Sequence, residues 1–232
     1  QLGEAVVASV GNHVPVGQEG SEPMLVRLKP AVAESRWATA YCLAYAGGST
    51  VAFNDFAKHA PEWLEVVAVE MPGKGALADF AWPADAPAGE VASAEAEAAE
   101  AKMISRLAER LAEDAAGTSM LLVGWSMGGM LATEIALHLH AAKTPPRLLH
   151  IAGRLAPGSF VEAAAGDIEK YVLASPEVRQ SEAWREWLLP MMMADLRADA
   201  RAERRVAHAL ALAGAHGPPL SCQVQVCCGH ED

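Results

Sequence analysis

The sequence predicts an α/β fold in which helices cover both faces of a mostly parallel sheet. Short apolar runs alternate along the chain with longer stretches of helical pattern, which is the order that crossover connections between parallel strands require. The runs are nearly continuous in apolar residues, as expected of strands that are buried on both faces. The chain has 232 residues, of which 52% are hydrophobic and 20% charged, so it can build the core of one large domain or of two small ones.

The expected strands are the apolar runs at 37–45, 64–71, 119–124, 147–153 and 222–229. The expected helices lie between them, at 51–59, 92–115 and 127–142. Pro72-Gly73 end the run at 64–71, and Pro145-Pro146 precede the run at 147–153. In the helix at 92–115, Ile104, Leu107 and Leu111 share one face and charged residues lie off it, which predicts a helix packed on the core.

Two segments flank or interrupt this alternation. Residues 1–36 are expected to be a linker or an edge-strand extension, with 24–30 their one plausible strand, and residues 37–232 form the main domain. A mostly helical insertion at about 157–217 separates two late strands, which is where a lid would lie. Its Met191–Met193 run suits either an adaptable lid over an apolar channel or packing against the core, and we favour packing for each one.

Charge and cysteine content exclude several classes of function. The formal net charge of −11 disfavours a nucleic-acid surface. Four arginines between Leu196 and Arg205 form a local basic cluster, which we interpret as a solvated helix face: Arg197, Arg201, Arg204 and Arg205. The four cysteines show neither a C-x-x-C pair nor a zinc-site spacing, and Cys42 and Cys228 lie in strand-like runs. No apolar stretch reaches membrane-spanning length. We therefore expect a cytoplasmic protein that needs no metal or cofactor and binds no membrane.

The segment from Gly124 to Gly128 has the pattern G-x-S-x-G around Ser126. It follows an apolar strand and opens a helix, which is the setting of a nucleophile elbow. The glycines allow the strand and the helix to approach closely, and the helix N-terminus brings partial positive charge to the place where an oxyanion would form. The sequence therefore predicts that Ser126 is presented as a nucleophile. "AYAGGST", at 44–50, follows an earlier strand and could supply a second oxyanion donor through its backbone.

Several segments together resemble the type II, editing-type thioesterases of polyketide and nonribosomal peptide synthesis, which are α/β-hydrolases. The resemblance runs from about Trp37 to Asp232. It is carried by "AYAGGSTVAF" at 44–53, "GWSMGGMLATEIALHL" at 124–139, "LLHIAGRLAPG" at 148–158 and "LLPMMMADLRAD" at 188–199, with weaker support from "VVAVEMPGKG" at 66–75.

The resemblance implies a serine thioesterase that removes acyl groups from the phosphopantetheine arm of acyl or peptidyl carrier proteins, in polyketide, nonribosomal peptide or fatty acid synthesis. Ser126 would be the nucleophile, the backbone amides of Ala46 and Met127 the oxyanion hole, and Asp232 the acid that orients a histidine. Glu231 is a weaker candidate for that acid. Tyr45 and Trp125 stand where the family usually has histidine, which points to altered access or acyl preference. The arginine cluster is the one obvious docking surface for an acidic carrier protein.

The resemblance also places the catalytic histidine, with a last strand and helix, beyond Asp232, where this sequence does not extend. Within the sequence we consider His138, His140, His150, His208, His216 and His230 and favour none, since the Ser–Asp–His order requires a base after the acid. Two alternatives stay open: a carboxylester hydrolase or acyltransferase of the same fold, and a catalytically incomplete carrier-binding domain. The sequence does not indicate the oligomeric state.

Overall fold

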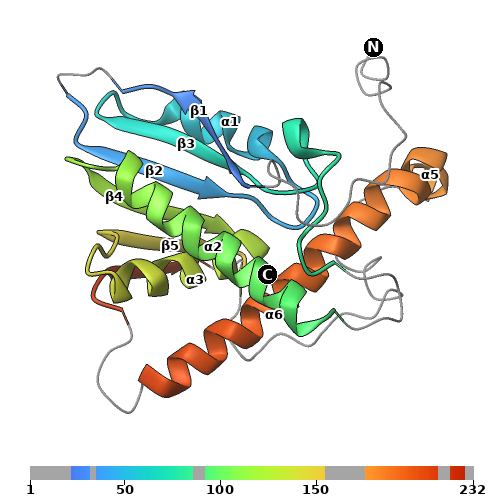
Figure 1. The fold of residues 1–232 in the computed structure, drawn as a ribbon. Helices are drawn as coiled ribbons and strands as arrows, with labels where there is room; N and C mark the ends of the chain where they lie inside the picture. The colour runs from blue at the N-terminus through green and yellow to red at the C-terminus, as the bar shows by residue number, and fades with distance from the viewer. Residues whose placement is uncertain (1–21, 32–34, 86–91, 155–175, 214–219, 228–232) are drawn as a thin grey trace.

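The structure, a computed structural model, describes residues 22–31, 35–85, 92–154, 176–213 and 220–227. Its sheet has the strand order β1-β3-β2-β4-β5-β6 (Figure 1). The strands are β1 (Met24–Lys29), β2 (Ala38–Leu43), β3 (Leu64–Glu70), β4 (Ser119–Trp125), β5 (Leu148–Ala152) and β6 (Gln223–Cys227). β1 pairs antiparallel with β3, and the other pairings are parallel. The predicted α/β class with a mostly parallel sheet is confirmed.

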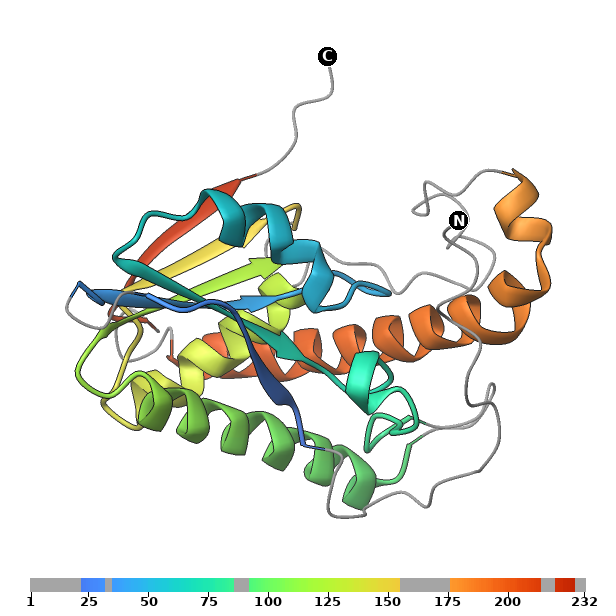
Figure 2. The same cartoon turned by 90° about the horizontal axis from the view of Figure 1, so that it is seen from above.

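Helices lie on both faces of the sheet (Figure 2). One face carries η1 (Thr50–Phe53) and α1 (Asn54–His59), and a short turn, η2 (Gly75–Leu77), follows β3. The other face carries α2 (Ala94–Asp114), α3 (Met127–Ala141) and α6 (Leu189–Ala213). Two short elements precede α6 in the chain: α5 (Pro176–Gln180) and the π-helical turn η3 (Trp184–Leu188).

Successive side chains of each strand point to opposite faces of the sheet, so the core has two parts, one on each face. In β2, Tyr41 and Leu43 belong to the cluster under α2 and α3, whereas Ala40 and Cys42 belong to the cluster under α1. Both sets are fully buried because β2 lies in the interior of the sheet, between β3 and β4. Burial raises the pKa of the Cys42 thiol, so this cysteine behaves as a small apolar residue.

The edges of the described sheet differ from its centre. β1 is exposed at Met24 and Arg27 and half-buried at its other residues, and β6 is exposed at every residue, including Val224 and Val226. Cys228, which the sequence places in the same strand-like run, lies outside the described residues. Within the described ranges, no helix combines the length and the apolar composition that crossing a bilayer needs.

The structure corrects the interpretation of the arginine cluster. Arg201 is buried and forms an ion pair with Glu100 of α2, and Arg205 pairs with both Glu100 and Glu134 of α3. Arg197 pairs with Asp85, and Arg204 makes a longer contact with Glu97. The expectation of a solvated helix face was therefore wrong for Arg201 and Arg205, whereas the side chain of Arg204 is 60% exposed as expected. The physical reason is that α6 packs on α3, so its arginines meet the glutamates of the neighbouring helices.

Candidate active site

Ser126 lies at the junction where β4 ends and α3 begins. Its backbone has φ 54° and ψ −116°, a region that non-glycine residues rarely adopt and that costs of order 1–3 kcal/mol. Two hydrogen bonds hold this conformation: Ser126 N donates to Ala152 O at 2.8 Å, and Gly129 N donates to Ser126 O at 2.9 Å. The strained turn predicted from the G-x-S-x-G pattern is therefore present at the carboxyl edge of the sheet.

The glycines beside Ser126 are required by close backbone approach. A Cβ atom added at Gly124 would lie 2.3 Å from the carbonyl oxygen of Gly128. One added at Gly128 would lie 2.0 Å from the carbonyl oxygen of Leu43, at the end of β2. Such distances are far inside van der Waals contact, so only glycine allows the elbow to pack against both its own helix and β2.

The turn after β2 lies against the same elbow and presents backbone amides. Gly48 N donates to Tyr45 O at 2.8 Å, and Gly47 has φ 79°, so residues 45–48 form a type II turn. The amide of Gly47 donates to Asp195 Oδ2 at 2.7 Å. Among the described residues, neither the amide of Ala46 nor that of Met127 has an acceptor. These two amides are thus available to a ligand, and Met127 adds the partial positive charge of the α3 N-terminus.

Two aromatic side chains flank the elbow. The rings of Tyr45 and Trp125 meet edge to face, with centroids 4.7 Å apart. Both are partly exposed, Tyr45 to 37% and Trp125 to 46%, so they form an apolar rim beside Ser126. Such a rim can contact an acyl group.

No described residue hydrogen-bonds to the hydroxyl of Ser126. His140 contacts Ser221, and His150 contacts Gln225 on the neighbouring strand β6. His138 lies at the far end of α3, about 18 Å along the helix from Ser126 at 1.5 Å per residue. Asp232, Glu231, His230 and His216 lie outside the described residues, so the structure does not place the predicted acid. In the described part of the chain, no group of His, Cys, Asp and Glu side chains is arranged to hold a metal ion.

Sequence reasoning missed the buried charges around the site. Asp195 of α6 accepts hydrogen bonds from Gly47 N, Lys74 Nζ and Trp82 Nε1. Arg154, just after β5, pairs with Asp199 and Glu203 of α6. The available signal was that Lys74, Arg154, Asp195 and Asp199 lie inside the segments that carry the family resemblance, in the ranges 66–75, 148–158 and 188–199.

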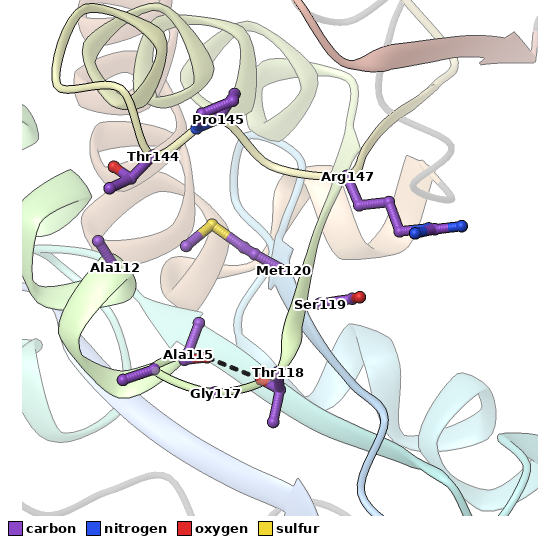
Figure 3. A pocket seen from close by; sticks show the side chains of 10 residues that line it. Ala112, Ala115, Gly117, Thr118, Ser119, Met120, Thr144, Pro145 and Arg147 are labelled. Carbon is purple, nitrogen blue, oxygen red and sulfur yellow. Dashed lines mark hydrogen bonds between the residues drawn. The ribbon is translucent and has the colours of Figure 1, made fainter.

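The molecule also has a hollow that is unrelated to this site. About 360 Å³ in volume, it is lined by the start of β4, the end of α2 and the loop before β5, as Figure 3 shows for Ser119, Ala115 and Arg147. Because Ser126 follows the last residue of β4, this hollow lies at the opposite, amino end of the strands. In open α/β sheets, ligands bind outside the carboxyl ends of the strands, so the elbow, and not this hollow, is the candidate active site.

Comparison with known proteins decides the family. The family model of the thioesterase domain matches residues 39–213, which is most of the chain. The chain belongs to the thioesterase family. As a thioesterase it is a hydrolase that acts on thioester bonds, and the predicted enzyme class is confirmed. A search of curated proteins found no match.

Solved structures support the same fold. YbtT, described as a type II thioesterase from the yersiniabactin NRPS/PKS biosynthetic pathway, is 24% identical to this thioesterase, with a TM-score of 0.62 over 90% of this chain and 79% of its own. RedJ, with a PEG molecule bound in its active site, is 25% identical, with a TM-score of 0.57 over 82% and 71% of the two chains. RedJ is described as a thioesterase of prodiginine biosynthesis in Streptomyces coelicolor.

Proposed function

We propose that this thioesterase releases acyl groups from the phosphopantetheine arm of acyl or peptidyl carrier proteins during polyketide or nonribosomal peptide synthesis. The observation that carries the proposal is the combination of the strained Ser126 with two backbone amides, Ala46 and Met127, that have no acceptor among the described residues. The similarity to YbtT and RedJ, both from such pathways, supports the substrate class.

In the proposed mechanism, Ser126 Oγ attacks the thioester carbonyl carbon while a histidine takes its proton. The carbonyl oxygen becomes an oxyanion, which accepts hydrogen bonds from the amides of Ala46 and Met127. The tetrahedral intermediate collapses, the C–S bond breaks, and the histidine returns the proton to the departing pantetheine thiolate. Water, deprotonated by the same histidine, then attacks the acyl-enzyme. The ester bond to Ser126 Oγ breaks, the histidine returns the proton to Oγ, and the acid leaves. Asp232 would orient that histidine, which we place beyond residue 232.

The other parts of the proposal concern arrangement and place in the cell. Residues 37–232 would form the thioesterase domain, preceded by a linker or edge-strand extension at 1–36. Within the lid at about 157–217, η3 and the first turns of α6 would lie over the acyl group, because Trp187 is partly exposed there while the later turns of α6 are ion-paired to α2 and α3. A carrier protein of cytoplasmic assembly lines would be the partner.

The test is hydrolysis of an acylated carrier protein by the purified full-length thioesterase, compared with Ser126→Ala. We expect the substitution to lower kcat/KM by roughly 10³-fold or more without loss of folding. Ser119→Ala is the matched control, because Ser119 begins the strand that Ser126 follows, at the opposite end of the sheet. Faster hydrolysis of an oxygen ester than of the thioester with the same acyl group would favour the carboxylester hydrolase instead.

One observation favours a second candidate, a catalytically incomplete carrier-binding domain: no histidine of the described residues hydrogen-bonds to Ser126. This candidate predicts that acyl-pantetheine carriers bind without being hydrolysed. Reading the gene past the codon for Asp232 separates the two, since the proposed mechanism requires a Gly-Gly-His segment downstream. An immediate stop codon would contradict the proposed hydrolysis.

A further inference from the structure

Asp195, in the second turn of α6, is a fully buried carboxylate with three donors from three different loops. Its Oδ2 accepts from Gly47 N at 2.7 Å, in the turn after β2. Its Oδ1 accepts from Lys74 Nζ at 2.7 Å, in the loop after β3, and from Trp82 Nε1 at 2.9 Å, after η2. One side chain therefore ties α6 to the loops at the carboxyl ends of β2 and β3, past which α6 runs in Figure 1.

The contact with Gly47 bears on the peptide group that joins Ala46 to Gly47. In a β-turn this central peptide group can take two opposite orientations, which distinguish type I from type II. In the observed type II turn, the Gly47 N–H points at the Asp195 carboxylate. A flipped peptide would point the Ala46 carbonyl oxygen at that carboxylate instead, which charge repulsion disfavours. The carboxylate thus selects one of the two conformations of the turn.

Packing holds the same turn from the α6 side. A Cβ atom added at Gly47 would lie 2.7 Å from Cγ of Met192, so α6 leaves room only for glycine at the φ of 79°. Met192 lies one helical turn before Asp195, and both side chains therefore reach the turn from the same face of α6. The turn is confined by an apolar contact and oriented by a charged one.

Stability alone gives no reason for a buried ion pair at this place. Lys74 is 4% exposed and Asp195 is 0% exposed, so both charges lose their hydration. Replacing such a pair by apolar side chains of similar volume is often neutral or stabilising. What an apolar pair would not supply is a charged acceptor for the Gly47 amide, which makes a shorter and stronger hydrogen bond than a neutral one.

We infer that Asp195 is a positioning residue, with Lys74 as its buried counter-ion. By fixing the Ala46–Gly47 peptide it holds the turn at 45–48 in its type II conformation, and with it the adjoining Tyr45–Ala46 peptide, whose N–H binds the oxyanion in the proposed mechanism. The inference rests on the proposed function, because it needs Ser126 as the nucleophile. It assigns to α6 a role in building the oxyanion hole, in addition to any role as a cover over the substrate.

The experiment compares two double variants of the full-length enzyme that differ only in the acceptor. Asp195→Asn with Lys74→Met removes both charges and keeps a side-chain oxygen for Gly47. Asp195→Leu with Lys74→Met removes both charges and the acceptor. Glu134→Gln is the control, because it also neutralises a buried carboxylate that binds an arginine of α6 but lies outside the loops around Asp195.

We expect kcat of the Asn variant to fall by at most about 10-fold, because its amide keeps an acceptor for Gly47 but lacks the charge that repels a flipped Ala46 carbonyl. We expect kcat of the Leu variant to fall roughly 10²-fold, with KM changed by less than about 2-fold. The control should keep its kcat per folded molecule. Equal kcat in the two double variants, or a fall in kcat that disappears when the rate is divided by the folded fraction, would overturn the inference. If the Leu variant does not fold, Asp195→Ala with Lys74→Met replaces it, since alanine cannot overpack the site.

Amide hydrogen exchange separates this inference from the proposed function. The Gly47 amide should exchange at least about 10-fold faster in the Leu variant than in the Asn variant, because its acceptor is lost. This readout needs no turnover. If the wild type fails to hydrolyse acyl carriers, the proposed function fails, and equal exchange at Gly47 in both variants would then reject the positioning role as well.

Discussion

At the residue scale, the geometry of the elbow depends on the absence of a side chain at Gly128. An alanine there would place its Cβ 2.0 Å from Leu43 O and 2.8 Å from Ala44 O, so β2 and α3 would have to separate. We expect Gly128→Ala to lower the free energy of unfolding by about 3 kcal/mol or more. Urea unfolding measures this loss.

The comparison for that variant is Gly117→Ala. Unlike Gly128, Gly117 has a positive φ, of 82°, and an added Cβ would meet nothing within 4 Å, so the substitution should cost only the backbone strain of about 1 kcal/mol. A loss for Gly128→Ala no larger than that for Gly117→Ala would mean that the approach of β2 to α3 does not make glycine necessary at Gly128.

The aromatic rim beside Ser126 consists of two side chains in direct contact, Tyr45 and Trp125. Because the Tyr45 and Trp125 rings meet edge to face at 4.7 Å, removing both should cost less than the sum of the single losses. A double-mutant cycle with Tyr45→Leu and Trp125→Leu should give a coupling free energy of about 1 kcal/mol in unfolding experiments. Pairing Tyr45→Leu with Trp37→Leu, at the other end of β2, should give additive losses, and coupling of similar size in both cycles would contradict a direct contact.

At the scale of elements, α6 is held to the rest of the helical layer by buried charges. Glu100 of α2 binds Arg201 at 2.6 Å and Arg205 at 3.1 Å, and its side chain is 0% exposed. Glu100→Gln would leave a buried guanidinium without its counter-ion, so we expect a loss of about 3–5 kcal/mol in the free energy of unfolding. Chemical denaturation at neutral pH tests this.

An exposed pair between the same two helices provides the reference. Glu97 and Arg204 lie 3.4 Å apart with side chains 45% and 60% exposed, so Glu97→Gln should change stability by less than about 0.5 kcal/mol. If the two substitutions cost the same, burial does not decide the strength of these contacts.

The elements themselves were largely predictable, and their contacts were not. β3 is buried at every residue, and its apolar run is visible in the sequence, as is the amphipathic pattern of α2. By contrast, Glu100 and Arg201 are 101 residues apart in sequence, and nothing in either segment specifies the other as its partner. The arginines therefore looked solvated when α6 was considered alone.

At the scale of the whole molecule, the candidate site is assembled from loops that only the parallel sheet brings together. The sequence indicated Ser126, Met127 and the glycine turn because each belongs to a local pattern with known backbone consequences. Asp195 could not be assigned in this way, since its partners Gly47 and Lys74 are 148 and 121 residues away. A local pattern can predict which groups are exposed at a strand end, but the choice of their partners depends on how α6 crosses the sheet edge.

The buried charges of α6 also affect how stability depends on pH. Burial raises the pKa of Asp199 above its ordinary value of 3.8, while Arg154 opposes this shift and Glu203 and Asp195 add to it. Between 3.8 and the raised pKa, the folded protein therefore binds more protons than the unfolded chain. The contribution of Asp199 to the free energy of unfolding is thus fully present below pH 3.8 and is lost as pH rises through the folded-state pKa.

Asp199→Asn removes this titration and keeps the shape of the side chain. We expect the free energy of unfolding of the wild type, relative to the variant, to fall as pH rises above about 4, by at most about 1.4 kcal/mol per pH unit. Urea unfolding of both proteins between about pH 3.5 and 7 gives the difference, in which the other carboxylates cancel. A difference that rises with pH would show that the attraction of Arg154 outweighs burial, and that Asp199 is charged wherever the protein is folded.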